Sequence, residues 1–148
     1  MDINGNLWTV EHGAKGGDEV NRPEAGRNYG WPKISYGRHY SGAKIGAGTK
    51  ADDMEQPIHY WDPSIAPSGM TIYQGALFPQ WQGDIFIGAL RGEFISHLTV
   101  KNGQVISEER LIEDEFGRIR DIRTGPDGAL WFVTDDSDGA LYRIHPAE

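Results

Sequence analysis

Residues 83–88 read Gly-Asp-Ile-Phe-Ile-Gly, and this stretch decides the fold class. Glycine and a polar residue suit a turn, and the aliphatic and aromatic side chains that follow suit a short, well-buried strand. The order of glycine, small or polar residue, aliphatic and aromatic occurs twice more, at residues 5–8 and 128–131. The chain is therefore predicted to repeat one β-sheet unit, and its fold class is predicted to be all-β.

The spacing of the three copies indicates the architecture. The second and third copies begin at residues 83 and 128, and a separation of 45 is typical of β-propeller blades. The first copy begins 78 positions before the second, so the first unit is expected to contain a long insertion. We place it in the glycine-rich stretch at about residues 13–56, since loops of this length often carry function. A β-sandwich remains the alternative on spacing alone.

Strand signals fill most of the remaining chain. Helical periodicity is weak, because Gly or Pro interrupts the longer windows. Asn102-Gly103 separates two β-rich runs and predicts a tight hairpin. We predict strands at residues 6–10, 57–61, 70–73, 84–88, 94–100, 104–107, 119–123, 129–134 and 140–144.

Composition excludes several functional classes. The 148 residues fit a single domain, residues 1–148, and a net charge of −8 argues against a nucleic-acid partner. The absence of cysteine excludes disulfides, thiolate catalysis and iron–sulfur clusters. No apolar run is long enough for a membrane-spanning helix, and the first residues show no signal-peptide pattern, so the sequence assigns no compartment.

The start of the insertion carries the most specific motif. Residues 11–21 (EHGAKGGDEVN), followed by residues 26–32 (GRNYGWP), resemble the soluble aldose (glucose/sorbosone) dehydrogenases that use pyrroloquinoline quinone (PQQ). Further segments match that family in order: Trp61 and residues 64–69, 78–81, 88–92, 118–121 and 125–130. The resemblance covers nearly the whole chain but only the C-terminal half of the family, whose propeller has six blades. It therefore implies a partial β-propeller of about three blades.

The same resemblance implies that the family's catalytic histidine and an Arg-Asn pair at the quinone lie N-terminal to this chain. We therefore assign no catalytic residue. The inherited chemistry is oxidation of an aldose at its anomeric carbon, in which the cofactor takes the hydride and the protein supplies orientation and a base. With candidates for the cofactor cradle but without that base, the isolated chain is not expected to oxidise sugar.

Asp18, Glu19 and Tyr29 are the candidate metal residues. The resemblance implies that Glu19 and Tyr29 belong to a calcium site beside the quinone, with Asp18 as the adjacent acid. Calcium takes several oxygen ligands, and a glycine-rich loop exposes carbonyls where a carboxylate adds charge. The alternative is that Asp18 and Glu19 are two solvated loop acids. The match of the surrounding residues favours calcium.

The candidate quinone residues are His12, Gly13, Ala14, Tyr40, Arg91, Arg118 and Arg120. In the resembled family the His-Gly-x tripeptide lies at the quinone, and backbone carbonyls of its last two positions reach a calcium ion. Ala14 stands where proline is frequent, a change that a carbonyl ligand tolerates. The resemblance also implies a tyrosine near Tyr40 and a basic residue, often lysine, at Arg91.

Arg118 and Arg120 are two residues apart, so a strand would turn both side chains to the same face. The quinone is a flat tricarboxylate, and guanidinium groups bind carboxylates bidentately. On the innermost strand of an open propeller, this pair would face the axial channel. The alternative is that the two arginines decorate an exposed strand face.

Two other functional classes stay open besides a calcium-binding, sugar-dehydrogenase-like fragment. One is a non-enzymatic, calcium-stabilised propeller module that assembles as a homodimer. The other is a calcium-dependent hydrolase of the lactonase type, in which calcium acts as a Lewis acid. The tryptophans that could wall a sugar site, Trp31, Trp61 and Trp81, are expected to be mostly packing residues.

Besides an aldose sugar, the sequence predicts a protein partner, because half a propeller leaves its first and last sheets uncovered. Both flanking sheets are expected to expose apolar side chains that a full propeller would bury between blades. A second copy closing the ring as a homodimer, or the missing N-terminal half, would cover them. Neither nucleic acid nor a membrane is expected as a partner, and the resembled family is periplasmic or secreted.

Overall fold

Within residues 1–147, which the computed structural model describes, the strands form three antiparallel sheets in chain order. The first sheet holds β1 (Thr9–Glu11), β2 (Asp18–Asn21) and β3 (His59–Trp61). The second holds β4 (Pro67–Ile72), β5 (Ile85–Ala89), β6 (Ile95–Lys101) and β7 (Gln104–Leu111), and the third holds β8 (Ile119–Thr124), β9 (Leu130–Thr134) and β10 (Leu141–Ile144). The one helical element in this range is a 3₁₀ turn, η1 (Pro79–Trp81). The all-β prediction is confirmed.

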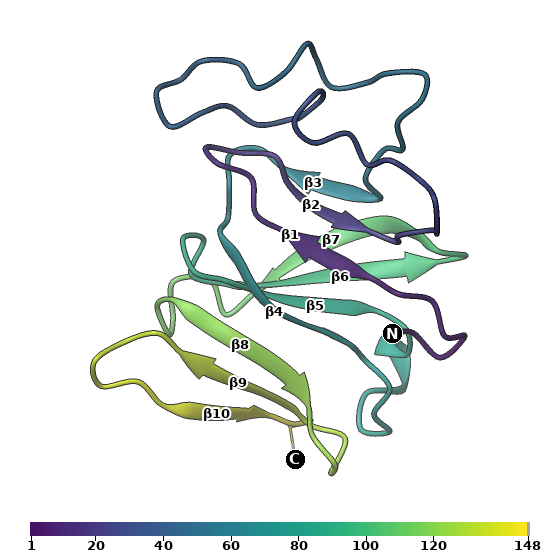
Figure 1. The fold of residues 1–148 in the computed structure, drawn as a ribbon. Helices are drawn as coiled ribbons and strands as arrows, with labels where there is room; N and C mark the ends of the chain where they lie inside the picture. Colours follow the sequence, from purple (N-terminus) through teal and green to yellow (C-terminus); the bar gives the residue numbers. More distant parts are fainter. Residues whose placement is uncertain (148) are drawn as a thin grey trace.

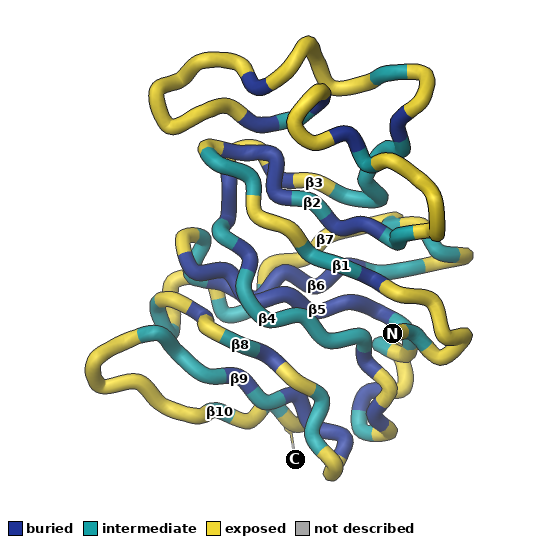
Figure 2. Tube along the Cα trace, in the orientation of Figure 1, coloured by how far each residue is buried: buried dark blue, intermediate teal, exposed yellow. Residues whose placement is uncertain are grey.

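The three sheets are stacked, with one apolar core on each side of the middle sheet (Figure 1). Strand β5 contributes to both cores, because alternate side chains of a strand point to opposite faces. Ile85 and Ile87 pack with Trp8 and other residues of the first core, whereas Phe86 packs in the second core. This burial on both faces explains the uninterrupted apolar run at residues 85–87. Figure 2 shows the buried residues concentrated along β5 and β6.

Each predicted strand overlaps an observed one, with ends that differ by a few residues. The Asn102-Gly103 hairpin is confirmed, since it joins β6 to β7 with Lys101 paired to Gln104. Both turn residues have positive φ angles, 52° for Asn102 and 74° for Gly103. This is the backbone geometry of a type I′ turn, whose twist matches that of the strands it connects.

The long insertion differs from the prediction in one respect. Strand β2 (Asp18–Asn21) lies within residues 13–56 and forms the middle of the first sheet, between β1 and β3. Its sequence, Asp-Glu-Val-Asn, has little β-propensity. Tertiary packing selects the strand, because Val20 is fully buried in the first core. Beyond β2, the described part of the insertion forms two isolated bridges, Ile34 with Gly48 and Arg38 with Lys44.

The expectation of two apolar flanks is wrong for the first sheet. Trp8, Val20 and Trp61 face the core, so strand alternation turns Glu11, Glu19 and Asn21 to the outer face. The segment between β2 and β3 lies over this sheet (Figure 1), where Tyr36 stacks on Tyr60 of β3 with ring centroids 3.8 Å apart.

The third sheet does have an apolar outer face. A hollow of about 470 Å³ is lined there by Trp131, Val133 and Leu141, among other residues. Because the two flanks differ, they give no support to a symmetric pairing in which two apolar flanks meet. Closure by a second copy stays a prediction. Within the described residues, no helix has the length and apolar character needed to cross a membrane.

Two of the three candidate tryptophans are packing residues, as expected. Trp61 is 5% exposed and belongs to the first core, and Trp81 packs against the second. Trp31 is 65% exposed and differs from the other two.

Candidate functional site

Several of the candidate site residues lie at one end of the stacked sheets. The loops that follow β1, β5 and β9 and the loops that precede β4 and β8 are all found at this end (Figure 1). These loops carry His12–Ala14, Ser64, Arg91, Arg118 and Asp135. In a stack of antiparallel sheets, neighbouring loops at one end form a common surface, so these side chains share one surface of the molecule.

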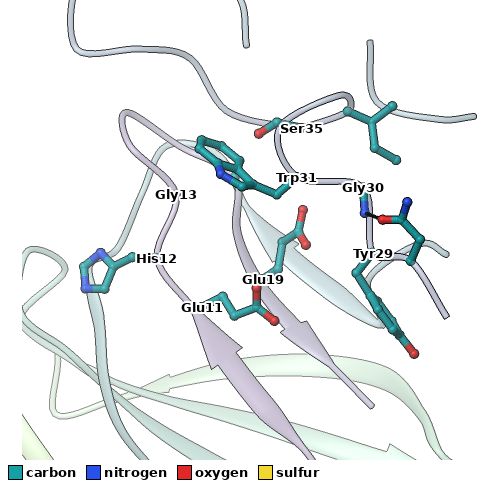
Figure 3. A pocket seen from close by; sticks show the side chains of 11 residues that line it. Glu11, His12, Gly13, Glu19, Tyr29, Gly30, Trp31 and Ser35 are labelled. Atoms are coloured by element: carbon teal, nitrogen blue, oxygen red, sulfur yellow. Dashed lines mark hydrogen bonds between the residues drawn. The ribbon is translucent and has the colours of Figure 1, made fainter. Parts of the chain in front are cut away.

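A hollow of about 360 Å³ separates the outer face of β1 and β2 from the insertion (Figure 3). Glu11 ends β1 and is the direct cross-strand partner of Glu19 in β2. Residues opposed in this way on an antiparallel pair present their side chains to the same face. Both carboxylates therefore line the hollow, together with His12, Tyr29 and Trp31. Among its described lining residues there is no Lys or Arg.

One amide group serves both carboxylates. Asn21 Nδ2 donates to Glu11 Oε1 at 3.1 Å and to Glu19 Oε2 at 3.3 Å. The Oδ1 atom of the same amide is buried without a hydrogen-bond partner in the described part of the chain. Glu11 accepts one further hydrogen bond, from Thr9 Oγ1 at 3.1 Å. The two carboxylates still repel each other, since like charges directly opposite one another on adjacent strands are destabilising.

The electrostatics of the hollow disfavour two free carboxylates. Burial raises the pKa of Glu19, the hydrogen bond from Asn21 lowers it in part, and the charge of Glu11 raises it further. Desolvation and a neighbouring like charge both penalise the ionised form. A cation bound between Glu11 and Glu19 would remove both penalties.

Tyr29 lines the hollow, but its hydroxyl is already committed. It donates to the carbonyl of Arg22 at 3.0 Å and accepts from the backbone N–H of Glu24 at 3.1 Å. The phenol therefore holds the start of the insertion in place. An oxygen ligand from Tyr29 would be its backbone carbonyl.

Asp18 does not join Glu19 at the hollow. It is fully buried, because strand alternation turns it to the opposite face of β2. Its carboxylate accepts hydrogen bonds from the backbone N–H groups of Gly13, Ile65 and Ala66, at 2.7, 2.8 and 3.1 Å, and from Ser64 Oγ at 2.8 Å. Asp18 thus ties the loop after β1 to the loop before β4.

The His12–Ala14 segment combines an exposed histidine with a tightly held glycine. His12 and Gly13 line the hollow, and Gly13 donates its N–H to Asp18. A Cβ on Gly13 would collide with the backbone of Gly16 and Gly17, so this turn requires the missing side chain. Lys15 N donates to the carbonyl of Arg38 at 2.9 Å and fastens the turn to the insertion.

The candidate quinone side chains fall outside the hollow. Among the described residues, Tyr40, Arg91, Arg118 and Arg120 do not line it. Tyr40 is 80% exposed, and Arg91 Nη1 donates to the carbonyl of Ser64 at 3.1 Å. The guanidinium groups of Arg118 and Arg120 both contact Asp135, at 2.8 and 3.0 Å, so they lie on the same side, although Arg118 precedes β8 and the register of β8 shifts at Arg120. The site thus has two parts, an acidic hollow and an arginine pair.

Sequence reasoning missed Glu11, Asn21 and Asp135. Each of them acts through strand pairing: Glu11 lies opposite Glu19, Asn21 lies two residues after Glu19 on the same face, and Asp135 follows β9 beside Arg118. The pairing of β1 with β2 would have revealed the first two. The described residues contain no group of three or more His, Asp or Glu side chains arranged to hold a metal ion. A cation here would need backbone oxygens besides the two carboxylates.

Comparison with known proteins places these residues in a family. Residues 1–143 match the glucose/sorbosone dehydrogenase family. The chain is 46% identical over 142 residues to the aldose sugar dehydrogenase YliI of Escherichia coli (strain K12), which covers 95% of this chain and 38% of that protein. It is 44% identical over 140 residues to the uncharacterized protein slr1608 of Synechocystis, covering 93% of this chain and 34% of that protein.

Solved structures agree with the sequence match. A crystal structure of glucose dehydrogenase has a TM-score of 0.92 at 46% identity, over 97% of this chain and 42% of that one. The apo-form of the soluble aldose sugar dehydrogenase from Escherichia coli has a TM-score of 0.89 at 46% identity, over 96% and 42%. A PQQ-bound aldose sugar dehydrogenase from Streptomyces coelicolor, covered over 97% and 41%, has a TM-score of 0.71 at 24% identity, which shows the fold alone.

The chain therefore spans less than half the length of the curated relatives and solved structures it matches. Within that span, the likeness to these structures confirms the predicted partial propeller.

Proposed function

Because this chain belongs to the glucose/sorbosone dehydrogenase family, we propose that it forms the calcium- and PQQ-binding part of an aldose sugar dehydrogenase. The observation that carries the proposal is the carboxylate pair of Glu11 and Glu19, which face one hollow without a Lys or Arg in its described lining. A cation bound between the two carboxylates would offset their repulsion, and the remaining oxygen donors would select which cation binds.

The donor set fits calcium. Calcium prefers carboxylate and carbonyl oxygens and tolerates irregular, many-membered coordination. Glu11 and Glu19 would supply the charge, and backbone carbonyls of Gly13 and Tyr29, two residues that line the hollow, would supply neutral oxygens. The Oδ1 atom of Asn21, buried without a partner in the described chain, leaves a polar group beneath this site unsatisfied. Asp18 contributes indirectly, because it fixes Gly13.

PQQ is proposed for the surface beside this hollow, where Arg118, Arg120 and Arg91 bring guanidinium groups suited to carboxylates. When bound, the quinone supplies the electron acceptor for oxidation of an aldose at its anomeric carbon. The residues described here bind and orient, and none of them is proposed as the general base. Tyr40, 80% exposed, is available as a stacking surface.

Thermal unfolding with and without calcium tests the metal half of the proposal. A ligand that binds only the folded state stabilises it by about 2.7 kcal/mol at a hundredfold excess over its Kd. We expect millimolar CaCl₂ to raise the Tm of the wild-type chain, and Glu19→Gln and Glu11→Gln to remove most of that shift. Glu115→Gln, which changes an exposed glutamate outside the hollow, is the matched control. An unchanged wild-type Tm would contradict a calcium site.

Titration of the calcium-loaded chain with PQQ, followed by tryptophan fluorescence, tests the cofactor half. Saturable quenching that weakens in Arg118→Ala is the expected result. Two assays separate the other functional classes. Lactone hydrolysis that needs calcium but no quinone would favour a hydrolase, and calcium stabilisation without PQQ binding would favour a non-enzymatic module.

A further inference from the structure

One carboxylate oxygen gathers two guanidinium groups at the start of the third sheet. Arg118 donates to Asp135 Oδ2 from Nε at 3.0 Å and from Nη2 at 2.8 Å, and Arg120 donates to the same atom from Nη2 at 3.0 Å. Three N–H groups therefore converge on a single acceptor. The two cations are held side by side, although like charges on one strand face repel each other.

The backbone fixes the position of this acceptor. Asp135 follows β9, and its N–H donates to the carbonyl of Arg118 at 2.8 Å. The neighbouring residues Ile119 and Thr134 are paired across β8 and β9, so the contact continues the ladder of the sheet. Asp135 is therefore held at its place by the sheet rather than by its side-chain contacts.

Arg120 reaches Asp135 through an irregularity in β8. Ile119 pairs with Thr134 and Asp121 pairs with Val133, so Arg120 is the additional residue of a β-bulge. Bulges change the direction of a side chain relative to a regular strand. Both the bulge and the backbone contact of Asp135 thus favour the same arrangement of the arginine pair.

The arrangement leaves donors free for a ligand. The Arg118 and Arg120 side chains are 47% and 50% exposed. Arg118 Nη1 and Arg120 Nε and Nη1 form no hydrogen bond within the described part of the chain. A planar carboxylate that approached from solvent would meet two guanidinium groups already turned toward each other, and guanidinium groups bind such anions through paired N–H donors.

We propose that Asp135 is a positioning residue that holds Arg118 and Arg120 as a two-pronged receptor for a ligand carboxylate. The identity of that ligand, PQQ, rests on the function proposed above. Without Asp135, two long and mobile side chains would repel each other and lose their common orientation. A ligand would then have to order them itself, which weakens binding.

Removing Asp135 has two effects of opposite sign, which makes the test decisive. The loss of its negative charge would strengthen the attraction of the site for an anion, whereas the loss of its hydrogen bonds would disorder the receptor. If Asp135 only adds repulsive charge, its substitution tightens binding. If it positions the arginines, substitution weakens binding despite the more favourable net charge.

The binding experiment compares Asp135→Asn and Asp135→Ala with Asp138→Asn, which removes a carboxylate from the same loop without a contact to either arginine. The probes are PQQ and benzene-1,3,5-tricarboxylate, a flat tricarboxylate without a quinone. We expect Kd to rise about threefold or more in Asp135→Asn, within the range for coupled residues of one network, and further in Asp135→Ala. Asp138→Asn should bind as well as the wild type or slightly better. Equal or tighter binding by both Asp135 variants would overturn the proposal.

A second readout needs no ligand. In the wild type, the Nε–H of Arg118 donates to Asp135. In NMR spectra this proton should therefore exchange slowly with water, and the N–H group should show restricted motion. Asp135→Asn should weaken that protection and Asp135→Ala should abolish it, while Asp138→Asn should preserve it. If the wild type binds the tricarboxylate but not PQQ, the proposed function is contradicted. The Asp135 variants, measured with the tricarboxylate, then decide whether Asp135 positions the arginines. Binding of neither probe would contradict both.

Discussion

Two glutamates on neighbouring sheets have pKa values shifted in opposite directions, although burial acts on both in the same way. At Glu19, burial raises the pKa, and the adjacent charge of Glu11 raises it further. At Glu108 in β7, burial also opposes ionisation, but contacts with His59, Trp61 and Ser96 outweigh it and lower the pKa to about 2. The lesson is that the partners of a carboxylate, rather than its burial alone, decide whether the fold favours its charge.

The two glutamates differ in the hydrogen-bond donors that surround their carboxylates. The Glu108 carboxylate accepts from Trp61 Nε1 at 2.9 Å and from Ser96 Oγ at 2.8 Å, and His59 Nε2 lies 3.6 Å away. These contacts connect β7 of the second sheet to β3 of the first, so Glu108 is a structural tie between sheets. Glu19 meets one amide and another carboxylate. The fold supplies Glu108 with two hydrogen-bond donors, whereas Glu19 has a single side-chain donor among the described residues.

The largest expected effect comes from Asp18, the neighbour of Glu19 on the opposite face of β2. Asp18→Asn would turn amide hydrogens toward some of the backbone N–H groups that now donate to the carboxylate. Because hydrogen bonds to charged groups are worth 1.5–3 kcal/mol and buried unpaired donors add to the loss, we expect about 3 kcal/mol of destabilisation. Urea unfolding measures it, with Asp52→Asn in the exposed insertion as the control. A loss below about 0.5 kcal/mol, the usual range for surface changes, would show that Asp18 does not anchor the two loops.

An intermediate effect is expected for Glu108→Gln. The pKa of Glu108 is about 2 in the folded chain, against an ordinary glutamate value of 4.5, so its charge stabilises the fold above pH 4.5. This contribution is lost as pH falls from 4.5 toward 2. We expect the substitution to cost about 2 kcal/mol at neutral pH, and much less in strong acid.

Unfolding of wild type and Glu108→Gln at several pH values tests this, with Glu115→Gln as the exposed control. The difference in unfolding free energy between wild type and Glu108→Gln should shrink on acidification. If the difference in unfolding free energy stays constant with pH, the charge of Glu108 does not stabilise the fold, and the effect of the substitution comes from the shape of the side chain alone.

The smallest expected effect has the opposite sign. The folded pKa of Glu19 is raised, so ionisation of Glu19 disfavours folding increasingly as pH rises above the unfolded value. Without calcium, Glu19→Gln should therefore stabilise the chain at pH 7. Relief of a like-charge cross-strand pair is worth about 0.2–1 kcal/mol.

Calorimetry in EDTA at pH 7 and pH 4 measures the Glu19 effect, which should be larger at pH 7. Addition of calcium should then reverse the order of wild type and variant, because only the wild type retains both carboxylates. A Glu19→Gln chain that is less stable than wild type in EDTA at pH 7 would mean that Glu19 already has sufficient partners, like Glu108.

Much of this molecule follows from local sequence patterns. The strand at residues 84–88 and the Asn102-Gly103 turn depend on nearest-neighbour geometry, which alternation and turn preferences express directly. The motifs at residues 11–21 and 26–32, with the further segments that match in order, indicate the family. These features need no knowledge of which strands become neighbours.

The composition of the site depended on contacts between segments distant in the chain. Strand β2 has weak intrinsic preference and forms because Val20 is buried in the first core. Its formation turns Asp18 inward and Glu19 outward, places Glu11 opposite Glu19, and so separates two acids that are adjacent in the sequence. Asp135 likewise meets Arg118 and Arg120 only because β8 pairs with β9. The sequence determines the residue types and their order, but the register of the paired strands decides which charges meet. Side chains alternate along a strand, so a shift of one residue in register would exchange its two faces.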